Sequence, residues 1–120
     1  MKLRGIRGAI TVRENNADEV KEATVELISA IIKANNINTE DIAFINFSTT
    51  SDIDCVYPAK FARLNCDLEH VPLNCYQEMN VQGSLKMCIR VLVCINTDKN
   101  PFEIKHQYLR GALVLRPDII

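Results

Sequence analysis

Apolar and polar positions along the chain predict a mixed sheet with one long helix. Five segments alternate between apolar and polar residues or run apolar throughout, as strands do: 2–13, 42–49, 69–73, 87–96 and 112–116. Apolar residues recur every three or four positions over residues 17–34, which predicts a long helix. Pro58 suits the first turn of a short helix that ends near Asn65, and residues 101–107 read as a further turn or short helix. The pattern indicates an α/β or α+β domain.

Several residues mark where the backbone turns or is closely approached. Asn16 and Glu19 resemble a capping box, the reciprocal pair of hydrogen bonds that starts a helix. The asparagines at 35–36 predict its end, because asparagine tolerates the left-handed conformation there. In the first strand, Gly5 and Gly8 indicate a bulge or a close approach by another element.

The strands at 42–49 and 87–96 are apolar on both faces. One long helix covers only one face of a sheet, and little other helix is predicted that would cover the second. We therefore expect other copies of the chain to cover that face, which predicts a homo-oligomer.

Length and composition indicate a single globular domain over residues 1–120. The chain has a mass of 13.6 kDa, with 48% hydrophobic and 24% charged residues and no internal repeat. Its formal net charge of −1 disfavours a nucleic-acid partner, because such domains carry a clear basic excess. Five acids and one base lie between Glu14 and Glu26, so the rest of the chain has a small cationic excess that suits an anionic small molecule.

The cysteines and the N-terminus indicate the cytoplasm. Five cysteines are an odd number without a C-x-x-C pair, and their spacings match no zinc pattern, so we expect free thiols and no metal. A cysteine-based metal protein is therefore a poor alternative. Charged residues interrupt the N-terminus before any apolar stretch forms, and the longest run without charge, residues 42–51, is too short to cross a bilayer. No membrane partner is expected.

Arginines on predicted strands are the candidate chemistry. Arg90 lies mid-strand on a face otherwise made of cysteine and leucine, where a guanidinium cannot lose its charge and is costly to bury alone. Either a protein carboxylate pairs with it, or an anionic ligand completes the site. Arg7 on the first strand and Arg116 at the end of the last strand repeat the pattern, which favours a small polyanion.

Glu78, Cys75 and two tyrosines leave alternatives open. Glu78 lies near predicted strands, where it either neutralises an arginine or accepts a hydrogen bond from a substrate hydroxyl. Cys75 by itself is more often inert than nucleophilic, because a catalytic thiol needs a base beside it. Tyr57 and Tyr108 are read as packing residues whose hydroxyls find a partner. No glycine-rich nucleotide loop, zinc-protease motif or serine-hydrolase motif is present.

Ordered blocks along the whole chain resemble one family. The blocks are Arg4-Gly5-Ile6-Arg7-Gly8-Ala9 with Thr11-Val12; Tyr57-Pro58-Ala59-Lys60 with Arg63; Val71-Pro72; Cys75, Gln77-Glu78-Met79, Val81 and Gly83; Leu85-Lys86 and Cys88-Ile89-Arg90-Val91; and His106, Tyr108-Leu109 and Val114-Leu115-Arg116-Pro117-Asp118. Together they resemble the monofunctional, trimeric chorismate mutases, whose fold looks like an α/β barrel. No single block is specific for this family, but the occurrence of all of them in this order, without large insertions, is.

The resemblance implies a function and an assembly. It implies the conversion of chorismate to prephenate, an intramolecular Claisen rearrangement on the route to phenylalanine and tyrosine, with no cofactor. It also implies a homotrimer that forms a pseudo α/β barrel, with three active sites at subunit interfaces.

The resemblance also implies roles for individual residues. Arg7 would bind a substrate carboxylate, and Arg90 would reach the ether oxygen and the pyruvyl carboxylate. Glu78 would hydrogen-bond the ring hydroxyl with Cys75 beside it, and Tyr108 would contact the pyruvyl side. The neighbouring chain would supply the other wall of the pocket, with these residues: Tyr57, Ala59, Lys60, Arg63, Leu73 and Asn74. Two further residues would lie near the mouth, Leu115 and Arg116.

The chain departs from the family pattern in places. Tyr57 stands where the family usually has Phe, and Asn74 where it often has Thr, so we expect a different pocket polarity. Residues 64–68 do not follow the usual pattern, and many relatives continue beyond Ile120 into a tail that closes over the site, so we expect less efficient substrate capture. The alternative function is a non-catalytic trimeric regulatory protein that binds a small carboxylate. Such a sensor would need the arginines but not Glu78 with a neighbouring thiol.

Overall fold

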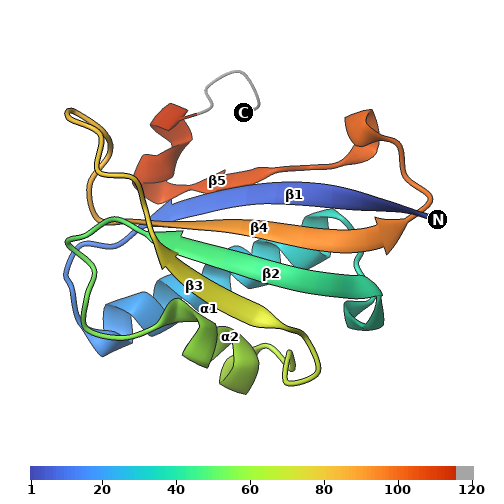
Figure 1. Cartoon of the computed structure of the whole chain (residues 1–120), viewed down its shortest axis with the longest axis horizontal. Coiled ribbons are helices and arrows are strands. Elements are labelled where there is room, and N and C mark those ends of the chain that lie inside the picture. The colour runs from blue at the N-terminus through green and yellow to red at the C-terminus, as the bar shows by residue number, and fades with distance from the viewer. Residues whose placement is uncertain (116–120) are drawn as a thin grey trace.

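The predicted sheet and long helix form in a computed structural model, which describes residues 1–115 of the chain (Figure 1). The sheet has five strands: β1 (Lys2–Thr11), β2 (Ile42–Thr49), β3 (Leu73–Gln77), β4 (Cys88–Thr97) and β5 (Gln107–Leu109). The α-helices in this part of the chain are α1 (Ala17–Ala34) and α2 (Pro58–Asn65). Short 3₁₀ helices join them: η1 (Thr39–Asp41), η2 (Pro101–Glu103) and η3 (Arg110–Leu115).

The strands lie in the order β3-β2-β4-β1-β5 and run in both directions. β4 is antiparallel to both of its neighbours, whereas β3 pairs parallel with β2 and β5 pairs parallel with β1. The prediction of a mixed sheet in an α+β fold is therefore confirmed. Residues 1–115 contain no helix that is long and apolar enough to cross a membrane.

One predicted strand is placed too early in the chain. The strand expected over residues 69–73 begins only at the last of these residues, as β3. Leu68 and Val71 are instead buried in a turn, in which the Val71 N–H donates to the Leu68 carbonyl over 3.1 Å. Pro72 then starts the pairing, since its carbonyl accepts a hydrogen bond from an N–H of β2. The prediction for this segment is wrong because buried turn residues imitate the apolar pattern of a strand.

The predicted last strand, over residues 112–116, is also wrong. The described part of this segment belongs to η3, and Arg116 lies outside the described residues. Of the turn or helix expected over residues 101–107, only η2 is helical, and the closing strand is β5. Arg110, with a φ of 53°, ends β5 by turning the backbone into the left-handed region. Ala112 then packs against the sheet. The residues around it are therefore apolar, although they do not pair with the sheet as a strand.

The ends of α1 follow the sequence signals with one change. Asn16 accepts a hydrogen bond from the Glu19 N–H at 2.9 Å, as in a capping box. The Glu19 carboxylate accepts from the Arg13 N–H at 3.1 Å rather than from Asn16, so the reciprocal half of the predicted box is wrong. At the other end, Asn36 has a φ of 49°, the left-handed conformation that the asparagine pair predicts.

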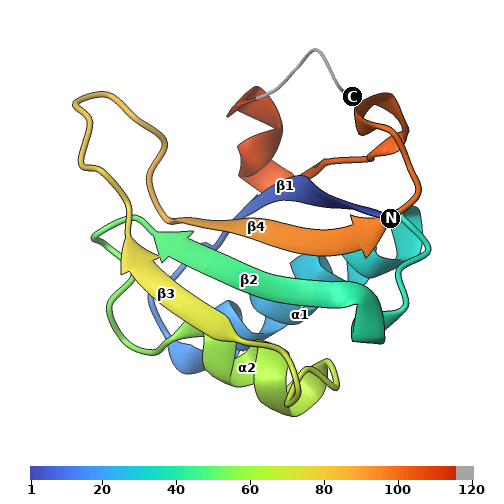
Figure 2. The same ribbon diagram turned by 45° about the vertical axis from the view of Figure 1, so that its right-hand side comes forward.

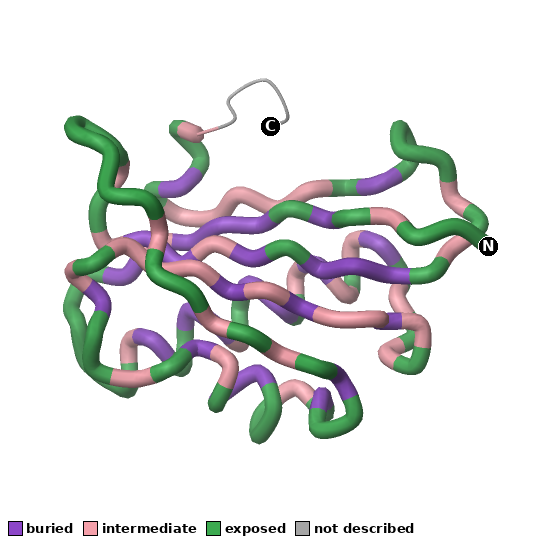
Figure 3. The backbone as a smooth tube through the Cα atoms, in the orientation of Figure 1, coloured by how far each residue is buried: buried purple, intermediate pink, exposed green. Residues whose placement is uncertain are grey.

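Both α-helices pack on the same face of the sheet (Figure 1; Figure 2). The shortest dimension of the protein is 21 Å, which leaves room for one sheet and one layer of helices. The core lies between these two layers, and its largest fully buried side chains include Phe47, Ile6, Ile10, Leu27 and Ile31. Figure 3 shows buried residues along β1, β2 and β4, and mostly exposed ones along the edge strand β3.

The opposite face of the sheet, called the outer face from here on, is covered only in part. At one end, η3 packs over Ala9 and Cys88, which are fully buried. Elsewhere on this face Leu3, Tyr76 and Leu92 remain 53%, 56% and 38% exposed. Within residues 1–115, both α-helices therefore cover one face of the sheet, and most of the other face is left uncovered, as the sequence predicts.

Asn35 fastens the segment before β5 to the end of α1. Its buried side chain donates from Nδ2 to the carbonyls of Ile31 and Lys105, at 2.9 and 3.0 Å. Its Oδ1 atom accepts the Lys105 N–H at 2.8 Å. Because β5 pairs with β1 through only three residues, these bonds help to hold the strand that carries Tyr108.

We expect Gly8→Ala to destabilise the fold, because α1 crosses β1 closely at this residue. A Cβ at Gly8 would lie 2.7 Å from Ile31 Cδ1 and 3.0 Å from Val91 Cγ1. Overpacking of this kind lowers the free energy of unfolding by about 1–3 kcal/mol. Urea denaturation measures the loss, with Gly5→Ala as the control, since its Cβ would meet only Leu92 Cδ1, at 3.2 Å. Equal stability of the two variants would contradict the close approach at Gly8.

Candidate active site

A row of side chains crosses the outer face from β2 to β5. Cα pairing aligns four residues: Ser48 on β2, Arg90 on β4, Ala9 on β1 and Tyr108 on β5. Residues opposite each other in neighbouring strands place their side chains on the same face. The register therefore brings Arg90 and Tyr108 onto one strip of the sheet.

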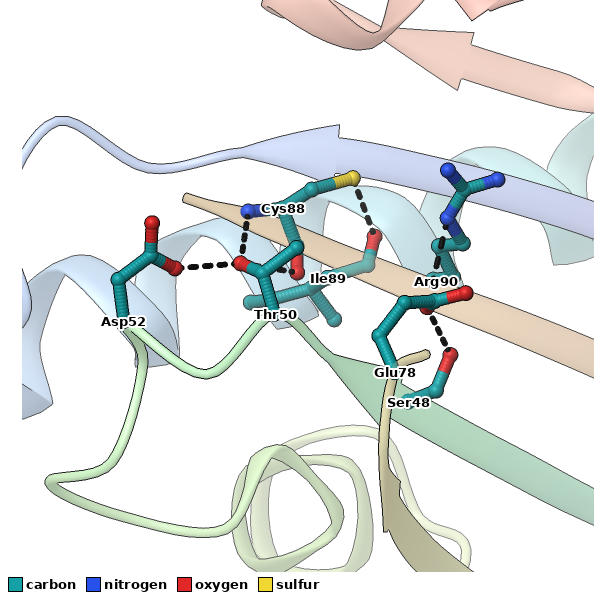
Figure 4. A network of polar contacts seen from close by, with 7 residues as sticks. All are labelled: Ser48, Thr50, Asp52, Glu78, Cys88, Ile89 and Arg90. Carbon is teal, nitrogen blue, oxygen red and sulfur yellow. Dashed lines mark hydrogen bonds and ion pairs between the residues drawn. The ribbon is translucent and has the colours of Figure 1, made fainter. Parts of the chain in front are cut away.

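Glu78, which follows β3, contacts two residues of this row, Arg90 and Ser48 (Figure 4). Glu78 Oε2 lies 3.4 Å from Arg90 Nε and accepts a hydrogen bond from the Ser48 hydroxyl at 2.7 Å. The contact with Arg90 is an ion pair without hydrogen-bond geometry, so the buried Nε has no hydrogen-bond acceptor within residues 1–115. The Arg90 side chain is 36% exposed, and its terminal nitrogens point away from the Glu78 carboxylate (Figure 4). A ligand can reach these nitrogens from the outer face.

Arg7 and Leu115 lie on the same face as this pair. Arg7 is two residues before Ala9 on β1 and is exposed. None of the ion pairs found within residues 1–115 involves its guanidinium, and its backbone N–H donates to His106 Nδ1 at 2.9 Å. Leu115 packs with Tyr108 against the buried cluster under η3. The structure thus gathers on one face the residues predicted to bind the carboxylates and the pyruvyl group.

A hollow of about 500 Å³ lies beside α2. It is lined by the residues that were predicted to form the wall from a neighbouring chain. All six contribute to its lining, together with Val71 and Cys75: Tyr57, Ala59, Lys60, Arg63, Leu73 and Asn74. Pro58 starts α2, so the residues at positions 59 and 63 lie one turn apart on the same side of the helix. The helix and the edge strand β3 therefore build this hollow jointly.

Within one chain, Cys75 lies in this hollow. The resemblance implies a place beside Glu78, but Glu78 contacts Arg90 and Ser48 on the outer face of the same chain. Cys75 is paired with Phe47 on β2 and packs against the core between the sheet and the helices. Burial raises the pKa of the Cys75 thiol above its usual value, against a smaller opposite effect of a hydrogen bond with the Ala59 backbone. The thiol is therefore protonated at neutral pH, which makes it a weak nucleophile.

The two groups of predicted residues occupy different surfaces of the chain. Arg7, Glu78, Arg90 and Tyr108 belong to the outer face, and none of them lines the hollow beside α2. The hollow is lined by residues of α2 and of the edge strand β3, and these two elements lie side by side in Figure 2. One chain therefore presents two separate parts of the predicted site.

Comparisons with known proteins bear on the whole chain. The family model described as chorismate mutase type I matches residues 3–119. The chain belongs to this family. Two curated relatives, both described as chorismate mutase AroH, are 42% identical to it: the Bacillus subtilis protein over 99% of this chain and 94% of its own, and the Thermus thermophilus protein over 98% and 96%. A solved chorismate mutase from Clostridium thermocellum has a TM-score of 0.90 and 43% identity, over 92% of this chain and 98% of that one.

The family decides between the functions that the sequence left open. As a type I chorismate mutase, the chain is an isomerase that converts chorismate to prephenate, a step of aromatic amino-acid biosynthesis. The function predicted from the ordered blocks is confirmed. A non-catalytic carboxylate sensor has no support from the family.

Sequence reasoning missed Ser48, which contacts Glu78 directly. A serine near the end of a strand otherwise rich in apolar residues carries no local signal of a role. Its position opposite Arg90 follows only from the pairing of β2 with β4. The cross-strand register is what reveals it.

All five cysteines are free thiols, as predicted. In residues 1–115 no group of histidines, cysteines and acids is placed to hold a metal ion. Cys88 is fully buried next to Arg90. Burial raises the pKa of its thiol from 9.0 to about 11, although Arg90 lowers this pKa, and Glu78 and Asp52 raise it further.

We expect alkaline pH to destabilise the fold through Cys88. Between pH 9.0 and about 11 the unfolded chain has lost a proton that the folded chain keeps, so rising pH favours unfolding. Urea denaturation should show the wild type losing about 2 kcal/mol more than Cys88→Ala between about pH 8 and about pH 10.5. Cys55→Ala removes an exposed thiol and should lose as much as the wild type. Equal losses in the wild type and Cys88→Ala would contradict this assignment.

Proposed function

We propose that the rearrangement takes place between two protomers of a homotrimer, where the arginines of one chain face the α2 hollow of the next. One protomer supplies Arg7, Glu78, Arg90 and Tyr108 from its outer face. Its neighbour supplies the hollow lined by these residues: Tyr57, Ala59, Lys60, Arg63, Leu73, Asn74 and Cys75. Leu115 lies near the mouth of the site, where the family resemblance implies Arg116 as well.

The observation that carries this proposal is the incompletely paired guanidinium of Arg90. A guanidinium is a cation, and Glu78 is the only ion-pair partner of Arg90 within residues 1–115, 3.4 Å from Nε. The buried Nε has no hydrogen-bond acceptor in this part of the chain, and the terminal nitrogens point away from Glu78 (Figure 4). Anionic oxygens bound beside these nitrogens would satisfy them. The ether oxygen and pyruvyl carboxylate of chorismate are groups of that kind.

The rearrangement needs a compact substrate conformer and fixed positive charge. Arg7 and Arg90 hold the two carboxylates of chorismate and so bring the reacting ends of the molecule together. As the C–O bond breaks, electron density builds on the ether oxygen. A guanidinium fixed beside that oxygen stabilises the transition state more than the substrate and therefore raises turnover. The reaction is unimolecular, so no step requires a metal or a cofactor.

The remaining residues orient the substrate. Glu78 accepts a hydrogen bond from the ring hydroxyl, and Tyr108, in the same row as Arg90, contacts the pyruvyl side. Lys60 and Arg63 add positive charge from the opposite wall, which suits a dianion. Cys75, held protonated by burial, offers at most a weak hydrogen bond and does not act as a nucleophile.

The uncovered outer face and the divided site support the same assembly. A second chain on the outer face would bury its exposed leucines and tyrosine, at about 25 cal/mol per Å² of apolar surface. The two half-sites differ in residues and lie on different surfaces, so their contact is heterologous, and contacts of that kind form a ring when the rotation between neighbours closes. A ring of three is the pseudo α/β barrel that the family resemblance implies.

The proposed partners are few. The substrate is chorismate, and neither nucleic acid nor a membrane takes part. Five free thiols support the predicted cytoplasmic location, because a reducing compartment keeps cysteines unpaired.

We expect Arg90→Ala to lower turnover by at least ~10²–10³-fold. Removing one donor to a developing oxyanion costs about 3–4 kcal/mol, and each factor of ten in rate corresponds to about 1.4 kcal/mol. Turnover is followed by the loss of the diene absorbance of chorismate, with prephenate confirmed by mass. Arg90→Lys should recover part of the loss, since an ammonium restores the charge but cannot bridge two oxygens as a guanidinium does.

Arg13→Ala is the matched control for this experiment. Arg13 is exposed before α1, and none of the ion pairs found in residues 1–115 involves it, so its loss should leave turnover unchanged. If Arg90 served only as a structural partner of Glu78, Arg90→Ala would melt at a lower temperature and its folded fraction would keep turnover. A well-folded Arg90→Ala enzyme with near-normal turnover would overturn the mechanism.

A further inference from the structure

Ser48 lies inside the site but has no part in the reaction as proposed so far. We propose that it is a positioning residue, whose hydroxyl holds one carboxylate oxygen of Glu78 so that the other oxygen faces the substrate and Arg90 stays available. This inference rests on the roles proposed above for Glu78 and Arg90. It follows from where Glu78 lies, what holds its side chain, and which arrangement that contact prevents.

Glu78 needs support because it is the first residue beyond the sheet. β3 ends at Gln77, and the chain returns to the sheet only at Cys88. The next six residues, 79–84, are all exposed and offer no rigid surface for the side chain. The Glu78 backbone N–H donates to the Thr49 carbonyl at 2.7 Å, which ties its backbone to β2. That bond leaves the rotatable bonds of the side chain free.

The Ser48 hydroxyl supplies the contact that fixes the carboxylate. It donates to Glu78 Oε2 at 2.7 Å from a half-buried position on β2, opposite Arg90. A hydroxyl that donates to a carboxylate forms a charge-assisted hydrogen bond, which is stronger than a bond between neutral groups. The ion pair with Arg90 uses the same Oε2 atom. The hydrogen bonds and ion pairs of Glu78 found within residues 1–115 thus use Oε2, and none of them uses Oε1.

Occupation of Oε2 prevents a competing arrangement. A glutamate beside an arginine readily forms a fork, in which both carboxylate oxygens bind two guanidinium nitrogens. That fork would turn the terminal nitrogens of Arg90 toward Glu78 and would also use Oε1. In the structure these nitrogens point away from the carboxylate (Figure 4). The Ser48 hydroxyl thus keeps the cation and the second carboxylate oxygen separately available to the substrate.

Ser48→Ala should lower kcat by about ten- to a hundred-fold, the range expected for a lost hydrogen bond to a charged group. KM should change less, because the arginines that bind the carboxylates remain. Ser48→Thr keeps a hydroxyl on a side chain that suits a strand and should recover most of the turnover. Ser29→Ala, which removes a hydroxyl from the exposed side of α1, is the matched control and should leave kcat unchanged.

A double-mutant cycle separates positioning from a structural role. Ser48→Ala added to Glu78→Ala should change kcat by no more than about twofold, because the hydroxyl acts only through the carboxylate. A structural role independent of Glu78 would add its full loss in that background as well. Ser48→Cys, which is similar in size and a weak donor, provides the same test if the alanine variant does not fold.

The outcomes distinguish this inference from the proposed function. Full kcat in folded Ser48→Ala, or additive losses in the cycle, would overturn the role of Ser48 while the losses in Arg90→Ala and Glu78→Ala still support the site. Unchanged turnover in both Arg90→Ala and Glu78→Ala would instead overturn the proposed site. Loss in Ser48→Ala, recovery in Ser48→Thr and no further loss in the Glu78→Ala background would support the positioning role.

Discussion

The guanidinium of Arg90 lies mid-strand on the outer face of the sheet. The site depends on the chain's own residues pairing with this cation only in part. Glu78 stands 3.4 Å away and leaves the buried Nε without a hydrogen-bond acceptor in residues 1–115. A bidentate partner would stabilise the free chain more but would compete with the substrate for the same nitrogens. Ser48 holds the carboxylate in the less complete pairing. The structure therefore retains a cation that an anionic substrate can complete.

The uncovered outer face follows from the same requirement. A long helix of the chain's own across the rest of this face would cover Arg90 as η3 covers Ala9, whereas a neighbouring chain can leave room for a small molecule at the contact. The stability of the chain comes from the other face, where α1 packs so closely on β1 that a Cβ at Gly8 would have no room. Rigid strands on that core hold the charged residues in place, as a reaction driven by orientation and electrostatics requires.

Sequence patterns suffice for the elements with long or well-marked periodicity. α1, α2 and β2 have the predicted bounds, because helical spacing, Pro58 and a continuous apolar run mark them. The prediction for β3 is misplaced because polar residues such as Asn74 interrupt the apolar pattern of this strand. The sequence of η3 resembles that of a strand because η3 packs on a face of the sheet. The roles of the site residues follow from a family resemblance rather than from periodicity. Ser48 could not be found at all, since its contact with Glu78 depends on how β2 pairs with β4.

Mixing two inactive variants tests most directly whether two chains share one site. Arg90→Ala removes the cation from one half-site, and Arg63→Ala alters the wall supplied by the neighbour, so each homotrimer alone should lose most of its turnover. When equal amounts are unfolded together and refolded, about a quarter of the interfaces in a heterologous ring join an intact Arg90 to an intact Arg63. The mixture should therefore regain about a quarter of wild-type turnover. A mixture no more active than its parents would contradict it, because each chain would then build its site alone.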